Sequence, residues 1–185
     1  MQLAEVLKLK LNTTDEISLA FGETAYQYML ACDDISRYVF DHDLLLNSVK
    51  LSKELYSHIR ETFGLKSQMA QSAIRTVTAR YQTVDTQYRK EPYTFKADNR
   101  WYRIPRDIRW LGKPLHFHRP QADLVRNRDY SFLNGGRDIS INTLSKRVVC
   151  PFTAAGSMGK FLDGTWKFGT AKLVKLKGSW YLHIS

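Results

Sequence analysis

Two histidines, His116 and His118, are the residues whose types and spacing first suggest chemistry in this chain. On a β-strand they would point to the same side, as two ligands of one metal ion must. No Asp, Glu or Cys close to them in the sequence supplies a third ligand. We therefore favour exposed strand histidines beside basic residues, and an enzyme with an unrecognised site built on this pair stays open as an alternative.

Other patterns typical of catalytic sites do not occur in the sequence. It contains no Gly-x-Ser-x-Gly elbow, no Walker A loop and no Gly-x-Gly-x-x-Gly fingerprint. The acidic residues Asp33, Asp34, Asp41 and Asp43 are expected in a loop that links helices, whereas metal-dependent nucleases hold clustered carboxylates on a rigid sheet. Cys32 and Cys150 lie far apart and outside any zinc-binding spacing, which predicts buried free thiols. The sequence thus predicts no catalytic residue, metal ligand or cofactor on this chain.

Basic and aromatic residues gather in the second half of the chain. Residues 1–88 hold 9 Lys/Arg and 11 Asp/Glu, whereas residues 89–185 hold 19 and 7, together with all four Trp. Arg forms paired hydrogen bonds with phosphate and aromatic rings stack on unpaired bases, so this half indicates a nucleic-acid partner rather than an ordinary basic surface. The candidate RNA contacts are Arg100, Trp101, Arg103, Arg119, Arg126, Arg128, Tyr130, Arg147 and Lys167. No apolar run is long enough to cross a membrane, so we expect no membrane partner and a cytoplasmic, prokaryotic location.

Three helices are predicted in the first half. A capping box at residues 13–16 opens the first, and Asp33-Asp34 is expected to end or interrupt it. The second spans about residues 48–63, with Gly64 in the position of a C-cap. The third is expected over about residues 67–84.

The third predicted helix carries a polar stripe opposite its apolar face. This stripe is rich in amides and hydroxyls, whereas a solvated face normally carries Glu and Lys. Gln pairs with adenine edges, Arg with guanine and Ser with either, so the stripe fits the major groove of a DNA duplex. A face packed on a neighbouring domain is an equal alternative. The candidate DNA contacts are Gln68, Gln71, Ser72 and Arg75.

After residue 90 the sequence changes to short alternating runs broken by Gly, Pro, Asn and Asp. The runs are residues 93–96, 101–104, 108–111, 115–118, 130–133, 139–143, 148–152, 165–168, 171–176 and 179–184. They predict an antiparallel barrel or strongly bent sheet, with hairpin turns at residues 134–136 and 177–178. A further strand is expected at residues 3–11. The order of strand, helices and strands predicts an α+β fold in which the helices are inserted after the first strand of a split antiparallel β-barrel.

Four segments, and the opening KLKLNTTDE, resemble the N-terminal half of TnpB proteins. These are transposon-encoded RNA-guided nucleases, ancestral to the compact type V CRISPR effectors. The segments are FGLKSQMAQSAIRTV (63–77), RPQADLVRNRDYSF (119–132), ISINTLSKRVVCPF (139–152) and GTAKLVKLKGSWYLHIS (169–185). The resemblance covers nearly the whole chain in order. It implies an OB-like wedge domain at residues 1–12 and 89–185, and a helical recognition domain at residues 13–88.

The resemblance also implies a function. The wedge domain would bind a guide RNA, and with the recognition helices it would read a short motif flanking the target DNA duplex and hold the RNA–DNA heteroduplex. In TnpB proteins a RuvC nuclease domain with metal-binding carboxylates follows the last strand, and its motif does not occur here. We therefore expect that this chain alone does not cut DNA, that Mg²⁺ belongs to a RuvC-domain partner chain, and that the pair forms a split effector. A stand-alone RNA-binding regulator or an inactive relic is the alternative.

Overall fold

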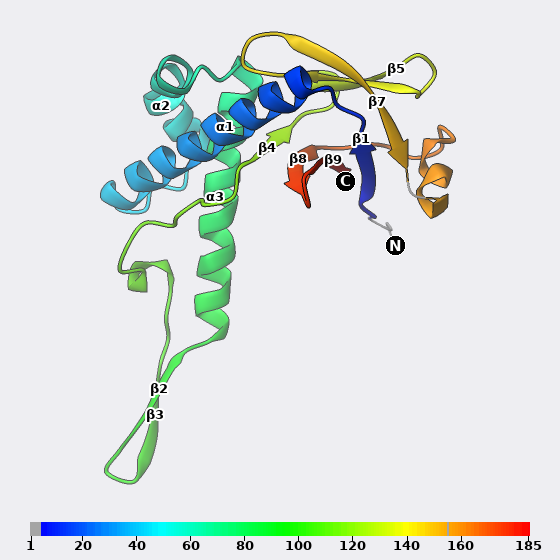
Figure 1. Ribbon diagram of the computed structural model, residues 1–185. Helices are drawn as coiled ribbons and strands as arrows, with labels where there is room; N and C mark the ends of the chain where they lie inside the picture. Colours follow the sequence, from blue (N-terminus) through cyan, green and yellow to red (C-terminus); the bar gives the residue numbers. More distant parts are fainter. Residues whose placement is uncertain (1–4, 155) are drawn as a thin grey trace.

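The computed structural model describes residues 5–154 and 156–185 and contains three long helices and a curled seven-stranded antiparallel sheet (Figure 1). The helices are α1 (Asp15–Asp41), α2 (Ser48–Phe63) and α3 (Ser67–Lys90). The strands are β1 (Leu7–Leu11), β4 (Gln121–Leu124), β5 (Tyr130–Leu133), β6 (Asp138–Asn142), β7 (Arg147–Ala154), β8 (Ala171–Leu176) and β9 (Ser179–Ile184), in the order β4-β8-β9-β1-β7-β6-β5. The predicted α+β class and barrel-like sheet are confirmed.

The first strand lies in the middle of the sheet. Leu9 of β1 faces Leu182 of β9 on one side and Ala154 of β7 on the other. The three leucines of β1 are buried and alternate with exposed lysines, so the strand presents one face to the core. The strand predicted at residues 3–11 is therefore confirmed from Leu7 onward, and positions 3 and 4 lie outside the described residues.

Helix α1 is fixed to the sheet by an aromatic contact. The rings of Phe21 and Trp180 pack edge to face, with centroids 5.7 Å apart and planes at 73°. The indole N–H of Trp180 donates a 2.9 Å hydrogen bond to Ser18 Oγ, and the backbone N–H of Leu144 donates to Thr24 Oγ1 at 3.2 Å. Buried residues of the helices and the sheet consequently belong to one hydrophobic core.

The start of α1 differs from the prediction by one residue. The N-cap is Thr14, whose hydroxyl accepts a hydrogen bond from the Ile17 N–H. The capping box predicted at residues 13–16 is therefore wrong. Glu16 instead forms an exposed ion pair with Lys146, at 2.7 Å.

The end or interruption of α1 predicted at Asp33-Asp34 is also wrong, because the helix continues to Asp41. Both carboxylates instead bind segments outside α1. Asp33 accepts the backbone N–H of Phe117, and its second oxygen lies 2.7 Å from Nδ1 of His116. Asp34 lies 2.8 Å from Nε2 of His58 on α2. The acidic pair thus connects α1 to the rest of the molecule in the middle of the helix.

Helices α2 and α3 follow the predictions more closely. Helix α2 ends at Gly64, whose φ of +65° is the left-handed conformation expected of a C-cap glycine. Helix α3 extends past its predicted end to Lys90. Asp85 near that end pairs with Arg89 at 2.7 Å and accepts the Ile108 N–H at 2.8 Å, so contacts with a later segment stabilise the last turns.

Three predicted strands do not form, and one strand is missed. The three are residues 108–111, which contain the short 3₁₀ helix η1 (Ile108–Trp110), and the irregular segments 115–118 and 165–168. Side chains of α1 and α3 satisfy the backbone of Leu115: its carbonyl accepts from Ser36 Oγ at 2.6 Å, and its N–H donates to Tyr81 Oη at 3.3 Å. The missed strand is β4, in which buried Ala122 and Leu124 alternate with the half-buried Gln121 and Asp123.

Strands β2 (Tyr93–Ala97) and β3 (Arg100–Ile104) form a separate hairpin instead of joining the main sheet. Figure 1 shows this hairpin projecting beyond the C-terminal end of α3, far from the seven-stranded sheet. Within the described ranges, no helix is both long and apolar enough to cross a membrane.

Candidate nucleic-acid interface

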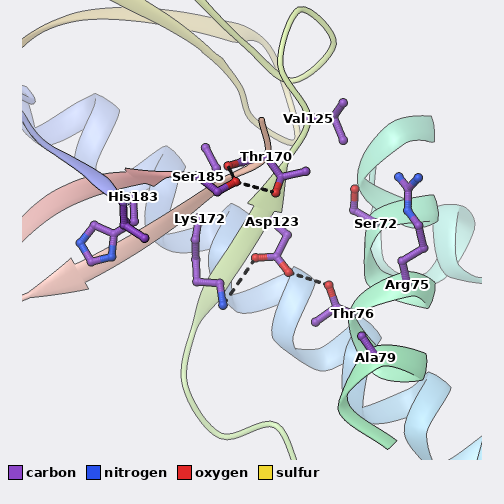
Figure 2. A pocket seen from close by; sticks show the side chains of 12 residues that line it. Ser72, Arg75, Thr76, Ala79, Asp123, Val125, Thr170, Lys172, His183 and Ser185 are labelled. Atoms are coloured by element: carbon purple, nitrogen blue, oxygen red, sulfur yellow. Dashed lines mark hydrogen bonds and ion pairs between the residues drawn. The ribbon is translucent and has the colours of Figure 1, made fainter. Parts of the chain in front are cut away.

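A groove runs between α3 and the edge of the sheet formed by β4 and β8. Two cavities of about 690 and 590 Å³ both have Thr76, Ala79, Asp123 and Lys172 in their lining, so they form one continuous depression, here called the α3–sheet groove. One end adds Ser72, Arg75, Val125 and His183 (Figure 2), and the other adds Arg80, Thr83, His116, His118, Arg119 and Gln121.

Four permanently charged cations line the groove. Arg75 and Arg80 come from α3, Arg119 from the segment before β4, and Lys172 from β8. The three arginines form no ion pair within residues 5–154 and 156–185. Asp123 is the one carboxylate side chain among the described lining residues, and Lys172 Nζ lies 3.9 Å from it. A concave surface with an excess of one charge sign concentrates ligands of the opposite sign.

A chain of hydrogen bonds fixes the floor of the groove. Thr76 Oγ1 on α3 donates to Asp123 Oδ2 on β4 at 2.6 Å, and Tyr28 Oη on α1 lies 3.0 Å from Thr76 Oγ1. Since the Thr76 proton is given to Asp123, Tyr28 is the donor of the second bond. Burial raises the pKa of Tyr28 well above its usual value, which keeps this phenol protonated. These bonds hold α1, α3 and β4 in fixed positions relative to one another at the groove.

The rim of the groove is held by α1. His116 is positioned by Asp33, as described above, and its ring lies 6.1 Å from that of His118, centroid to centroid. Asp33 is far from this pair in the sequence, so the sequence analysis missed it. Within the part of the chain that the structure describes, no three His, Cys, Asp or Glu side chains group as a metal site would require.

His183 on β9 lies at the opposite end of the groove, where Figure 2 shows it beside Lys172. Its Nε2 is buried and has no hydrogen-bond partner among the described residues. Burial lowers the pKa of His183, and the positive charges of Lys8 and Lys172 lower it further. The imidazole is therefore neutral at pH 7, and an anion bound nearby would favour its protonation.

The structure divides the four candidate DNA contacts between two surfaces. Ser72 and Arg75 line the groove, although Ser72 is only 5% exposed. Gln71 instead donates a 2.7 Å hydrogen bond to Ser52 Oγ of α2, so it packs within the helical part of the molecule. Gln68 is half-buried and does not line the groove.

The candidate RNA contacts lie in separate places rather than in one site. Arg119 is at the groove. Arg100, Trp101 and Arg103 are on the projecting hairpin, Arg126 and Arg128 are in the turn between β4 and β5, and Lys167 is exposed in the loop before β8. Arg126 lies over the ring of Phe168, 5.2 Å from its centroid.

Two of these candidates are used inside the protein. Tyr130 is fully buried, and its hydroxyl donates to the Gly169 carbonyl at 2.7 Å. Burial raises its pKa to about 12, and its ring is not presented for stacking on a base. The guanidinium of Arg147 donates to the Arg128 carbonyl and, at 3.1 Å, to Ser140 Oγ, so it braces the turn after β4.

Sequence reasoning overlooked part of the groove, although signals were present. Thr76, Arg80 and Thr83 recur along one side of α3 at spacings of four and three residues. Lys172 and His183 face each other across β8 and β9. Their pairing follows from the turn predicted at residues 177–178, because a two-residue hairpin turn fixes the register of the strands it joins.

Comparison with known proteins assigns no family to this chain. A scan against models of known protein families found no match, and neither did a search of the curated proteins.

Proposed function

We propose that this chain is the guide-RNA-binding and flanking-motif-recognition part of an RNA-guided DNA endonuclease of the TnpB type. In this proposal a RuvC-bearing partner chain supplies Mg²⁺-dependent cleavage, and base pairing with the guide RNA reads the target sequence. The seven-stranded sheet is then an OB-like wedge barrel, and α1 to α3 are its inserted recognition domain. Two features support this: the resemblance of the segments quoted above, and the position of the helices between β1 and the other strands of the same sheet.

The α3–sheet groove is the observation that carries the proposal. Its cations come from α3 and from the sheet side, so one polyanion could contact both parts of the molecule at once. Arginine supplies three of the four permanent charges, and its planar guanidinium binds phosphate in pairs of hydrogen bonds. Hydrogen bonds among Tyr28, Thr76 and Asp123 already fix the floor of the groove. Ligand binding therefore costs little conformational entropy in these side chains.

The two ends of the groove carry different sets of residues. Ser72 and Arg75 lie on the polar stripe of α3 and carry groups that form hydrogen bonds with base edges in a major groove. Arg80 and Arg119 at the other end, and Lys172, which lines both cavities, are cations that can bind phosphates, a contact that contributes affinity without sequence choice. We therefore assign the flanking-motif contact to Arg75 with Ser72, and the backbone contacts to the other three residues.

Gel shifts with DNA duplexes that carry or lack a candidate flanking motif test this assignment. Arg75→Ala should reduce the preference for the motif by about 5- to 150-fold and weaken the motif-free duplex much less. Arg80→Ala and Lys172→Ala should weaken both duplexes equally and lower the salt dependence of the binding constant by about one unit of slope each.

Lys53→Ala is the matched control, because Lys53 is an exposed cation on α2 that does not line the groove. Equal losses for Lys53→Ala and the groove variants would mean non-specific binding of a basic protein and would contradict the proposal. Binding of RNA without any preference among duplexes would favour the stand-alone RNA-binding regulator.

A further inference from the structure

We infer that the β2–β3 hairpin is a second binding site, specific for unpaired nucleotides, in which a base stacks on Trp101. The inference rests on the proposed function only for the identity of the RNA in the cell. The site itself is argued from the hairpin, which is remote from the α3–sheet groove (Figure 1).

One face of the hairpin is a ladder of apolar rings. Phe95 and Tyr102 are directly opposite each other, and their rings stack with centroids 5.2 Å apart and planes at 17°. Tyr93, opposite Ile104, lies 5.8 Å from Phe95 and 6.0 Å from Trp110 of η1. Isolated two-stranded hairpins are marginal in water. Cross-strand ring pairs of this kind stiffen the hairpin where no second layer covers it.

The other face combines one free ring with cations. Trp101 lies directly opposite Lys96, and Arg103 follows on the same side two residues along β3. The Trp101 side chain is 73% exposed, the largest exposure among the exposed hydrophobic residues. Within the described residues, no aromatic ring or cation packs against the indole. Most of the Trp101 surface is therefore available to a ligand.

The charge of the hairpin selects a polyanion as that ligand. Lys96, Arg100 and Arg103 form no ion pair in the described part of the chain, whereas Arg109 nearby pairs with Asp107. Three free cations on a hairpin of this size would repel a second copy of the same surface. An exposed ring flanked by cations is the arrangement that holds single-stranded nucleic acid, with bases on the ring and phosphates on the cations.

The spacing of these side chains fits one nucleotide. Residues on one face of a strand repeat about every 6.6–6.8 Å, and directly opposed residues lie about 4.5–5.5 Å apart. A base stacked on Trp101 therefore has Arg103 and Lys96 within reach of its neighbouring phosphates. The bases of a duplex are already stacked and paired, so this face binds unpaired nucleotides in preference to a duplex.

Fluorescence anisotropy tests the inference with a labelled single-stranded RNA of about 12 nucleotides and mixed sequence, and with the same RNA annealed to its complement. At about 0.15 M salt, Trp101→Ala should weaken single-strand binding by about 5- to 150-fold and leave duplex binding unchanged. Trp101→Phe, which keeps a ring, should stay within about threefold of the unmodified protein. Tyr26→Ala is the matched control, since it removes an exposed ring from α1, and it should change neither affinity.

Two results would overturn the inference: unchanged single-strand affinity in Trp101→Ala, or equal losses for single strand and duplex. Circular dichroism of the variant confirms the fold, which the exposed position of Trp101 should leave intact. This result and the test of the proposed function are independent. Trp101→Ala can leave single-strand affinity unchanged while the groove variants abolish motif recognition. Conversely, single-strand binding can depend on Trp101 even if the protein recognises no flanking motif.

Discussion

Thr76 on α3 donates a 2.6 Å hydrogen bond to Oδ2 of Asp123 on β4, and this bond joins the two walls of the α3–sheet groove. Tyr28 of α1 donates to the same threonine, so one hydroxyl links three elements. Asp123, the only acidic side chain among the described residues of the groove, thus has a structural role, and Lys172 offsets its charge. The remaining cations are left for a ligand.

Thr76→Val should destabilise the protein, because valine keeps the shape of threonine but leaves Tyr28 and one oxygen of Asp123 without a partner. Buried polar groups left in this state cost about 1–3 kcal/mol of unfolding free energy. Urea denaturation measures the loss. Thr83→Val is the control, since Thr83 is exposed on the same helix and, among the described residues, its hydroxyl bonds only to the Ala79 carbonyl. Equal losses in both variants would show that the link to Asp123 contributes nothing.

Asp129 should make stability fall as pH rises. Its carboxyl group is buried, Oδ2 accepts the Val125 N–H at 2.9 Å, and Oδ1 has no partner among the described residues. Burial raises the pKa of Asp129. Its stabilising contribution is therefore complete below the unfolded-state value of about 3.9 and is lost as pH rises through the folded-state pKa.

Asp129→Asn removes this titration, so the variant should gain stability relative to the unmodified protein as pH rises from about 4 to 7. Urea denaturation at several pH values measures that difference. A difference that stays constant over this range would contradict the raised pKa.

His183 should make stability fall as pH decreases, which is opposite to the effect of Asp129. Its lowered pKa means that the folded protein disfavours the imidazolium, so stability is present above about pH 6.5 and is lost as pH falls through the folded-state value. His183→Gln should flatten the dependence below about pH 6.5. Thermal denaturation between about pH 5 and 7.5 records it, and identical profiles for the two proteins would refute the prediction.

Arg147 should stabilise the fold through its hydrogen bonds rather than through its charge alone. Its guanidinium bonds to the Arg128 carbonyl and to Ser140 Oγ, a geometry that an ammonium group cannot reproduce. Arg147→Lys and Arg147→Ala should therefore both lower the unfolding free energy, by about 1 kcal/mol. Arg137→Ala, which removes an exposed arginine from the β5–β6 turn, should not. Full stability in Arg147→Lys would mean that charge alone matters at this position.

The strands that lie in the sheet were predictable where their own side chains set the pattern. β1, β8 and β9 alternate clearly, and the turn at residues 177–178 fixes the pairing of the last two. Residues 115–118 show a similar alternation, yet they form no strand because Ser36 and Tyr81 take the backbone bonds of Leu115. Those side chains are remote in sequence, so no local pattern reveals them.

The candidate site was predictable only in part, for the same physical reason. Arg75, Ser72 and Arg119 were identified from charge and helix face, and the fold brings them to one groove. Tyr130 is a predicted RNA contact because it follows arginines in the sequence, but its place in the core depends on the packing of β5 against the loop that carries Gly169. Composition indicates a class of ligand, whereas burial of a given side chain depends on tertiary contacts.

The most direct measurement of the central claim is sequencing of the RNA that co-purifies with this chain from its native host, at about 0.3–0.5 M salt to remove loosely held polyanion. The unmodified chain and the double variant Arg80→Ala/Lys172→Ala should be purified side by side. We predict one discrete, structured RNA with the unmodified chain and its loss from the variant. A heterogeneous mixture, or the same RNA on both proteins, would contradict a guide RNA held by the α3–sheet groove.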